Sequence, residues 1–131
     1  MEEIVVGIVV VSHSPELASG LAELAAQMAG PDVRIEHAGG TSDGTLGTDE
    51  GRVRDAIRRA DAGDGVVILG DLGSAILTIR HVLDSRANNH ATLIDAPIVE
   101  GTVAAAVIAS AGSSLEDVVH AAEEARSARK L

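Results

Sequence analysis

The chain has 131 residues, of which 46% are apolar, and a formal net charge of −10; it contains no cysteine and no Phe, Trp or Tyr. This length predicts one domain, residues 1–131, with a core of Val, Ile, Leu and Ala. The acidity disfavours nucleic acid and anionic membranes as partners, the lack of aromatics removes the usual base-stacking groups, and the lack of cysteine excludes disulfides and thiolate chemistry.

The first half of the chain predicts strands and helices in alternation. An unbroken, β-branched apolar run at 4–11 predicts a strand buried on both faces. Ser14 is a good cap and Pro15 a good first residue for a helix that stops at Gly30. The following predicted elements are a strand at 33–38, a glycine-rich loop at 39–47 and a helix opened by Thr48, Asp49 and Glu50.

The second half continues the alternation. The predicted elements are a strand at 65–69, a helix from Gly73 to Arg86, a strand at 91–95, an Ala-rich helix around 103–109 and a last helix capped by Ser114, with Arg126 in its final turn. Buried strands alternating with helices predict an α/β fold. We expect a three-layer sandwich, in which helices cover both faces of a mainly parallel sheet.

Candidate chemistry lies where the predicted strands end. In a parallel sheet the carboxyl ends of the strands share one edge, so His13 and Asp71 are expected to meet there. A carboxylate that accepts the imidazole N–H fixes the tautomer and leaves the other ring nitrogen free to attack. The helix start near Ser14 suits a phosphate. These features predict a phosphohistidine site, while an ordinary loop-end histidine and a turn aspartate remain the alternatives.

Other chemistries are less well supported by the sequence. The glycine-rich loop matches neither phosphate-cradling nucleotide motif, so its glycines either let backbone approach a phosphate or partner, or form a plain flexible loop. A hydrolase triad of Ser74, His13 and Asp71 lacks the G-x-S-x-G elbow. The remaining histidines have no metal-ligand spacing and predict no metal site; they are His37, His81, His90 and His120.

Four segments carry a resemblance to a known family: VVVSHSPELASGLAELAAQM, HAGGTSDGTLGTDEGRV, GVVILGDLGSAILTIRHVLD and DAPIVEGTVAAAV. They resemble the phosphotransferase subunits of bacterial dihydroxyacetone kinases, in the mannose-type enzyme IIA family of the phosphoenolpyruvate-dependent phosphotransferase system. The resemblance covers nearly the whole chain. It implies a homodimer and a mainly parallel sheet with an antiparallel edge contribution.

The resemblance also implies roles for individual residues. His13 is the phosphorylated nucleophile, attacking through Nε2, and Asp71 orients it by accepting from Nδ1–H. Ser74 would help to hold the phosphoryl group, although sugar-transport relatives have a longer stretch between the aspartate and the serine. The full set expected to bind the phosphoryl group is Ser14, Gly40, Thr41, Gly73 and Ser74.

The implied activity is phosphoryl transfer without a cofactor or metal on this chain. The donor would be the histidine phosphocarrier protein, charged from phosphoenolpyruvate, and the acceptor would be ADP on the nucleotide-binding subunit of dihydroxyacetone kinase. Two alternatives stay open: an enzyme IIA domain serving sugar transport, and a non-catalytic anion-binding or interaction module. The acidic start of the chain lacks a signal peptide's positive charge, and its apolar run is too short for a membrane span, so a cytoplasmic location is expected.

Overall fold

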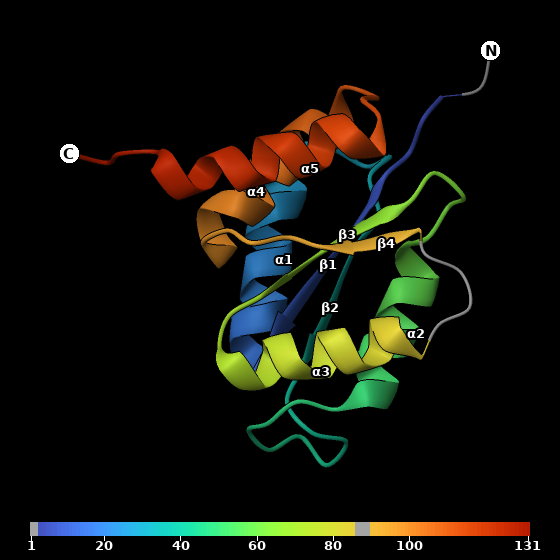
Figure 1. Ribbon diagram of the computed structural model, residues 1–131, viewed down its shortest axis with the longest axis vertical. Helices are drawn as coiled ribbons and strands as arrows, with labels where there is room; N and C mark the ends of the chain where they lie inside the picture. Colours follow the sequence, from blue (N-terminus) through green and yellow to red (C-terminus); the bar gives the residue numbers. More distant parts are fainter. Residues whose placement is uncertain (1–2, 86–89) are drawn as a thin grey trace.

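The computed structural model describes residues 3–85 and 90–131, in which strands and helices alternate along the chain (Figure 1). The strands are β1 Gly7–Ser12, β2 Ile35–Gly39, β3 Val66–Gly70 and β4 Ala91–Leu93. The helices are α1 Pro15–Ala29, α2 Glu50–Ala60, α3 Gly73–Asp84, α4 Ile98–Ser110 and α5 Leu115–Glu124, and a 3-10 turn, η1 Ala125–Ser127, follows. The predicted α/β fold is confirmed.

The described strands form one parallel sheet in the order β2-β1-β3-β4. β1 lies in the centre and pairs with both β2 and β3, so that Ser12 faces Gly39 and Val11 faces Gly70. The chain therefore leaves two adjacent central strands at the same edge of the sheet. The antiparallel edge contribution implied by the resemblance has no counterpart within residues 3–85 and 90–131.

Helices cover both faces of the sheet. In Figure 1, α1, α4 and α5 lie on one face and α2 and α3 on the other. A hydrophobic core lies between the sheet and the helices on each face. Ile8 of β1 packs in the core under α1, α4 and α5, and Val9 and Val11 pack in the core under α2 and α3. This explains the unbroken apolar run, because a parallel strand covered on both faces has no side that faces water.

Several predicted boundaries differ from the structure: β2 begins at Ile35 rather than at residue 33, and β4 ends at Leu93 rather than at residue 95. β1 begins at Gly7 rather than at residue 4, because its neighbour β3 begins at Val66, the partner of Gly7, and leaves the preceding residues unpaired on that side. α4 begins directly after Pro97 and is longer than predicted. The predicted helix end at Arg86 lies outside the described residues. None of the described helices is long and apolar enough to cross a membrane.

Candidate functional site

The ends of β1 and β3 bring His13 and Asp71 together, as the sequence predicts. The Asp71 carboxylate accepts from the backbone N–H of His13 at 3.2 Å, from its neighbour Leu72 N–H at 2.7 Å and from the Ser12 hydroxyl at 2.6 Å. Asp71 N–H itself donates to the carbonyl of Val11 at 3.3 Å. The aspartate thus holds the loop that carries His13 from two sides.

The His13 ring has a different neighbour from the one expected. Its Nδ1 lies 3.3 Å from the Ser74 hydroxyl, and an Asp71–imidazole bond is not among the hydrogen bonds of the described residues. The physical reason is that backbone N–H groups and Ser12 already occupy both oxygens of Asp71. With Nδ1 facing Ser74, Nε2 is the ring nitrogen that faces no hydrogen-bond partner within that part of the chain.

Two helix starts flank this histidine, and the first is already satisfied. At α1 the Ser14 hydroxyl accepts from Leu17 N–H at 3.3 Å, Pro15 has no N–H to offer, and Glu16 places negative charge in the first turn. The hydroxyl of Ser14, which was expected to bind the phosphoryl group, caps α1 in the structure. The cap uses one N–H group of this helix start, and Glu16 offsets its positive dipole end.

The start of α3 is open instead. Its N-cap residue, Leu72, makes no side-chain cap, and the first turn holds no acidic residue. Among the α-helices of the described residues, only α3 lacks both features. The first N–H groups of a helix and its positive dipole end attract anions. Gly73 and Ser74 occupy this start, beside the His13 ring.

The glycine-rich loop is fastened to the backbone of the histidine segment. Gly47 N–H donates to the carbonyl of His13 at 2.8 Å, and Gly40 N–H donates to the carbonyl of Ser12 at 3.4 Å. Gly39 and Gly40 are buried, and a Cβ on Gly39 would lie 2.6 Å from the Ser14 carbonyl oxygen. Glycine is needed here for close approach to the start of α1, and the N–H of Gly40 is already bonded to the Ser12 carbonyl.

The tip of this loop is an internal network around Asp43. The carboxylate accepts from the Thr41 hydroxyl, the Thr45 hydroxyl at 2.7 Å and Thr45 N–H at 3.1 Å. These hydrogen bonds lower the pKa of Asp43 from 3.8 to about 2, and the bond from Thr41 has the largest effect. The hydroxyl of Thr41 is engaged in this network, and it has no hydrogen bond to His13 within the described part of the chain.

Sequence reasoning missed two hydroxyl groups at the site. Ser12 is fully buried and bonded to Asp71; a polar residue that ends an otherwise apolar strand was the available signal. Thr48 Oγ1 lies 3.5 Å from Ser74 Oγ, and only the tertiary fold joins them.

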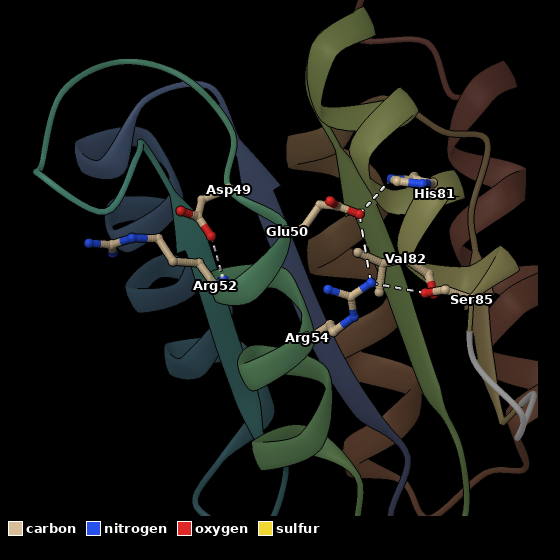
Figure 2. Close-up of polar contacts among 7 residues, drawn as sticks. All are labelled: Asp49, Glu50, Arg52, Arg54, His81, Val82 and Ser85. Atoms are coloured by element: carbon tan, nitrogen blue, oxygen red, sulfur yellow. Dashed lines mark hydrogen bonds and ion pairs between the residues drawn. The ribbon is translucent and has the colours of Figure 1, made fainter.

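Behind Thr48 and Ser74, polar contacts join α2 to α3. Figure 2 shows Glu50 pointing toward His81, with its Oε1 2.6 Å from His81 Nδ1. Arg54 Nη2 donates to the hydroxyl of Ser85 at 3.0 Å. These contacts join α2, which Thr48 precedes by two residues, to α3, whose first turn holds Ser74.

Comparison with known proteins gives a consistent picture. Residues 7–119 match the model of the EIIA-man family, described as PTS system fructose IIA component. Over 117 residues the chain is 39% identical to the PEP-dependent dihydroxyacetone kinase 2, phosphoryl donor subunit DhaM, of Listeria innocua serovar 6a, covering 87% of this chain and 94% of that protein. It is 38% identical over 131 residues to the PEP-dependent dihydroxyacetone kinase, phosphoryl donor subunit DhaM, of Escherichia coli K12, covering 95% of this chain but only 28% of that longer protein.

A solved structure shares the fold over almost its whole length. The crystal structure of EF1359, a protein of unknown function, superposes with a TM-score of 0.87 at 34% identity. The match covers 98% of this chain and 99% of the other. The sheet order and helix layers described above are therefore those of an existing protein structure.

Proposed function

The chain belongs to the EIIA-man family of PTS system fructose IIA components, and from this we propose that it is a phosphocarrier that takes a phosphoryl group on His13. One observation carries the proposal most directly: the ring of His13 lies beside Ser74, at the uncapped start of α3. A nucleophilic imidazole next to an anion-attracting helix end is the arrangement that phosphoryl transfer requires.

The proposed step exchanges one nitrogen–phosphorus bond for another. The lone pair of His13 Nε2 attacks the phosphorus of the donor's phosphohistidine, and the bond between that phosphorus and the donor imidazole breaks. The His13 proton stays on Nδ1, where the Ser74 hydroxyl lies 3.3 Å away. The donor ring leaves as a neutral imidazole when it enters the reaction protonated, so protons and charge balance.

The chain's own contribution is positioning and charge stabilisation. Asp71 and Gly47 fix the backbone of His13 on either side. In this proposal, the N–H groups of Gly73 and Ser74 receive phosphoryl oxygens as negative charge develops on them. Phosphoryl transfer depends mainly on such positioning and electrostatics, with little further chemistry for the protein to do.

The names of the relatives suggest the partners. Proteins 35–42% identical to this chain are named as phosphoryl donor or phosphotransferase subunits of dihydroxyacetone kinases. We propose that this chain receives its phosphoryl group from the histidine phosphocarrier protein and passes it to ADP on the nucleotide-binding subunit of such a kinase. The phosphoryl group would originate from phosphoenolpyruvate, and the carrier would act as a homodimer.

The first test is intact mass after incubation with phosphoenolpyruvate, enzyme I and the histidine phosphocarrier protein. Wild type is expected to gain one acid-labile phosphoryl group, and His13→Ala to gain none. His37→Ala, which removes an exposed histidine from neighbouring β2, is the matched control and is expected to load normally. An unmodified wild type, with the upstream carrier shown to be charged, would sink the proposal in favour of an anion-binding module.

The second test identifies the acceptor. The loaded chain is mixed either with the nucleotide-binding and dihydroxyacetone-binding kinase subunits, ADP and dihydroxyacetone, or with the membrane components of a mannose-type sugar transporter. Loss of the phosphoryl group with formation of dihydroxyacetone phosphate is the expected result. Discharge only to the transporter would assign the chain to sugar transport instead.

A further inference from the structure

Ser12, the residue before the histidine, is a polar side chain inside the core. It ends β1, pairs with Gly39 of β2 and is 0% exposed to solvent. Buried hydroxyl groups are costly unless they are hydrogen-bonded. An alanine would complete the apolar pattern of β1 equally well, so the hydroxyl calls for an explanation other than packing.

Both hydrogen-bonding capacities of this hydroxyl are used at the site. Ser12 Oγ donates to Asp71 Oδ2 at 2.6 Å and accepts from Ser14 N–H at 3.0 Å. The first bond reaches across to the end of β3, and the second reaches into the start of α1. A hydroxyl that donates to a carboxylate forms one of the stronger hydrogen bonds in proteins.

The effect of this bond on His13 passes through Asp71. The carboxylate accepts the backbone N–H of His13 at 3.2 and 3.4 Å, and its orientation depends on its other donors, Ser12 and Leu72 N–H. Removing the Ser12 hydroxyl would take away the shortest of these bonds and leave Oδ2 with only the 3.4 Å contact to His13 N–H. The carboxylate could then rotate away from the backbone of His13.

We propose that Ser12 is a positioning residue, whose hydroxyl locks the Asp71 carboxylate onto the backbone of His13 and so holds the imidazole in line for phosphoryl transfer. This inference rests on the proposed function of His13. It assigns Ser12 no contact with the phosphoryl group. Its predicted signature is a lower turnover with unchanged affinity for the donor, because the docking surface stays intact.

The experiment compares Ser12→Ala with Thr102→Val. Thr102 is also 0% exposed, and its hydroxyl has no hydrogen-bond partner within residues 3–85 and 90–131, so the control removes a buried hydroxyl without touching the site. Initial rates of phosphoryl loading are measured against the concentration of the charged histidine phosphocarrier. Ser12→Ala is expected to lower kcat roughly 10-fold to 100-fold at unchanged KM, as small misplacements of reacting groups do, and Thr102→Val to leave both constants unchanged.

A second measurement follows the hydrogen bond between the His13 amide and Asp71 directly. Amide hydrogen exchange of the unphosphorylated chain is compared by NMR, and the His13 amide decides, because it is bonded to Asp71 rather than to Ser12. It is expected to exchange faster in Ser12→Ala and to be unchanged in Thr102→Val.

Any of four outcomes would overturn the inference. In the kinetics, these are a wild-type kcat for Ser12→Ala and a lower loading rate that a raised KM explains. In the physical measurements, they are an absent melting transition of Ser12→Ala and an unchanged exchange rate of the His13 amide. A wild-type chain that takes up no phosphoryl group would overturn the proposed function. The amide comparison would still decide whether the Ser12 hydroxyl holds Asp71 on the backbone of His13.

Discussion

The helix starts of α1 and α3 lie on either side of His13 and differ in almost every respect. α1 has a serine cap, a proline in its first turn and an acidic residue beside it. α3 begins after Leu72 with neither a side-chain cap nor an acidic residue in its first turn. α1 is also covered by the glycine-rich loop, since Gly39 and Gly40 press on Ser14 and Pro15.

The two helix starts therefore serve different purposes. A capped helix start gives its N–H groups to its own side chains and so stabilises the fold, typically by about 1 kcal/mol. An uncapped start leaves those groups available to an anion. The backbone of His13 leads into the capped start of α1, and in the proposed function its ring works with the open start of α3.

The largest effect on phosphoryl loading is expected from a substitution that gives α3 a side-chain cap like that of α1. Leu72→Asp places a carboxylate where it can accept the first N–H groups of α3 and repel an incoming phosphoryl group. Phosphoryl loading should fall about 100-fold, which is the scale for losing transition-state hydrogen-bond donors. The melting temperature should hold or rise, because the helix gains a cap.

Leu72→Ala is the control for the lost leucine, which is 58% exposed. It removes the side chain without adding a carboxylate and should retain most of the loading rate. Equal loading by the aspartate and alanine variants would show that the open start of α3 takes no part in the transfer.

Disturbing the contact between the glycine-rich loop and α1 should mainly lower the free energy of unfolding. In Gly39→Ala the new Cβ would lie 2.6 Å from the Ser14 carbonyl oxygen and 2.7 Å from Pro15 Cα, so the loop and α1 must separate. We expect a loss of about 2 kcal/mol in the free energy of unfolding, as for other overpacked sites, measured by denaturant titration. Gly20→Ala, in open space on α1, should be neutral or stabilising; comparable losses in both variants would contradict this packing argument.

Removing the α1 cap should have a smaller effect, on stability alone. Ser14→Ala deletes the acceptor for Leu17 N–H and should lower the free energy of unfolding by about 1 kcal/mol. The initial loading rate should stay within about twofold of wild type once stability is accounted for. Ser114→Ala removes the equivalent cap of α5, where the serine accepts from Asp117 N–H at 3.2 Å. A much slower loading rate in Ser14→Ala than in Ser114→Ala would place Ser14 among the phosphoryl ligands after all.

The smallest effect concerns the loop tip that covers α1. Because the pKa of Asp43 is lowered to about 2 in the folded chain, its carboxylate favours the folded state above pH 3.8. That contribution disappears as the pH falls from 3.8 to about 2. A carbon-13 NMR titration should place the Asp43 midpoint near pH 2 in wild type and closer to 3.8 in Thr41→Val. Identical midpoints in the two proteins would contradict the role of the Thr41 hydroxyl.

Local signals predicted the fold well. The cap at Ser14, Pro15 after it and Gly30 at the end place α1 as observed, because these residues act within a few positions of themselves. The start of β1 was predicted three residues early, since a strand begins where its neighbour can pair with it, and sequence periodicity does not record the neighbour.

The site was predicted in outline, and its contacts were not. That His13 and Asp71 meet follows from the shared edge of parallel strands. The direction of the Asp71 carboxylate depends on Ser12 and on the His13 N–H, which come from 59 and 58 residues away in the sequence. The predicted phosphate-binding set included both helix starts, through Ser14 of α1 and Gly73 and Ser74 of α3; the sequence did not show that Ser14 would use its hydroxyl to cap α1 while α3 has no side-chain cap.

The central position of β1 has a consequence for biosynthesis. Its two neighbours in the sheet reach it only through crossover helices, β2 after α1 and β3 after α2. No hairpin can hold β1 in the meantime. On the ribosome, His13 is synthesised before Asp71 and Ser74, so its site is complete only after both of them have been added. Nascent chains arrested before residue 71 should therefore be inert toward the phosphoryl donor.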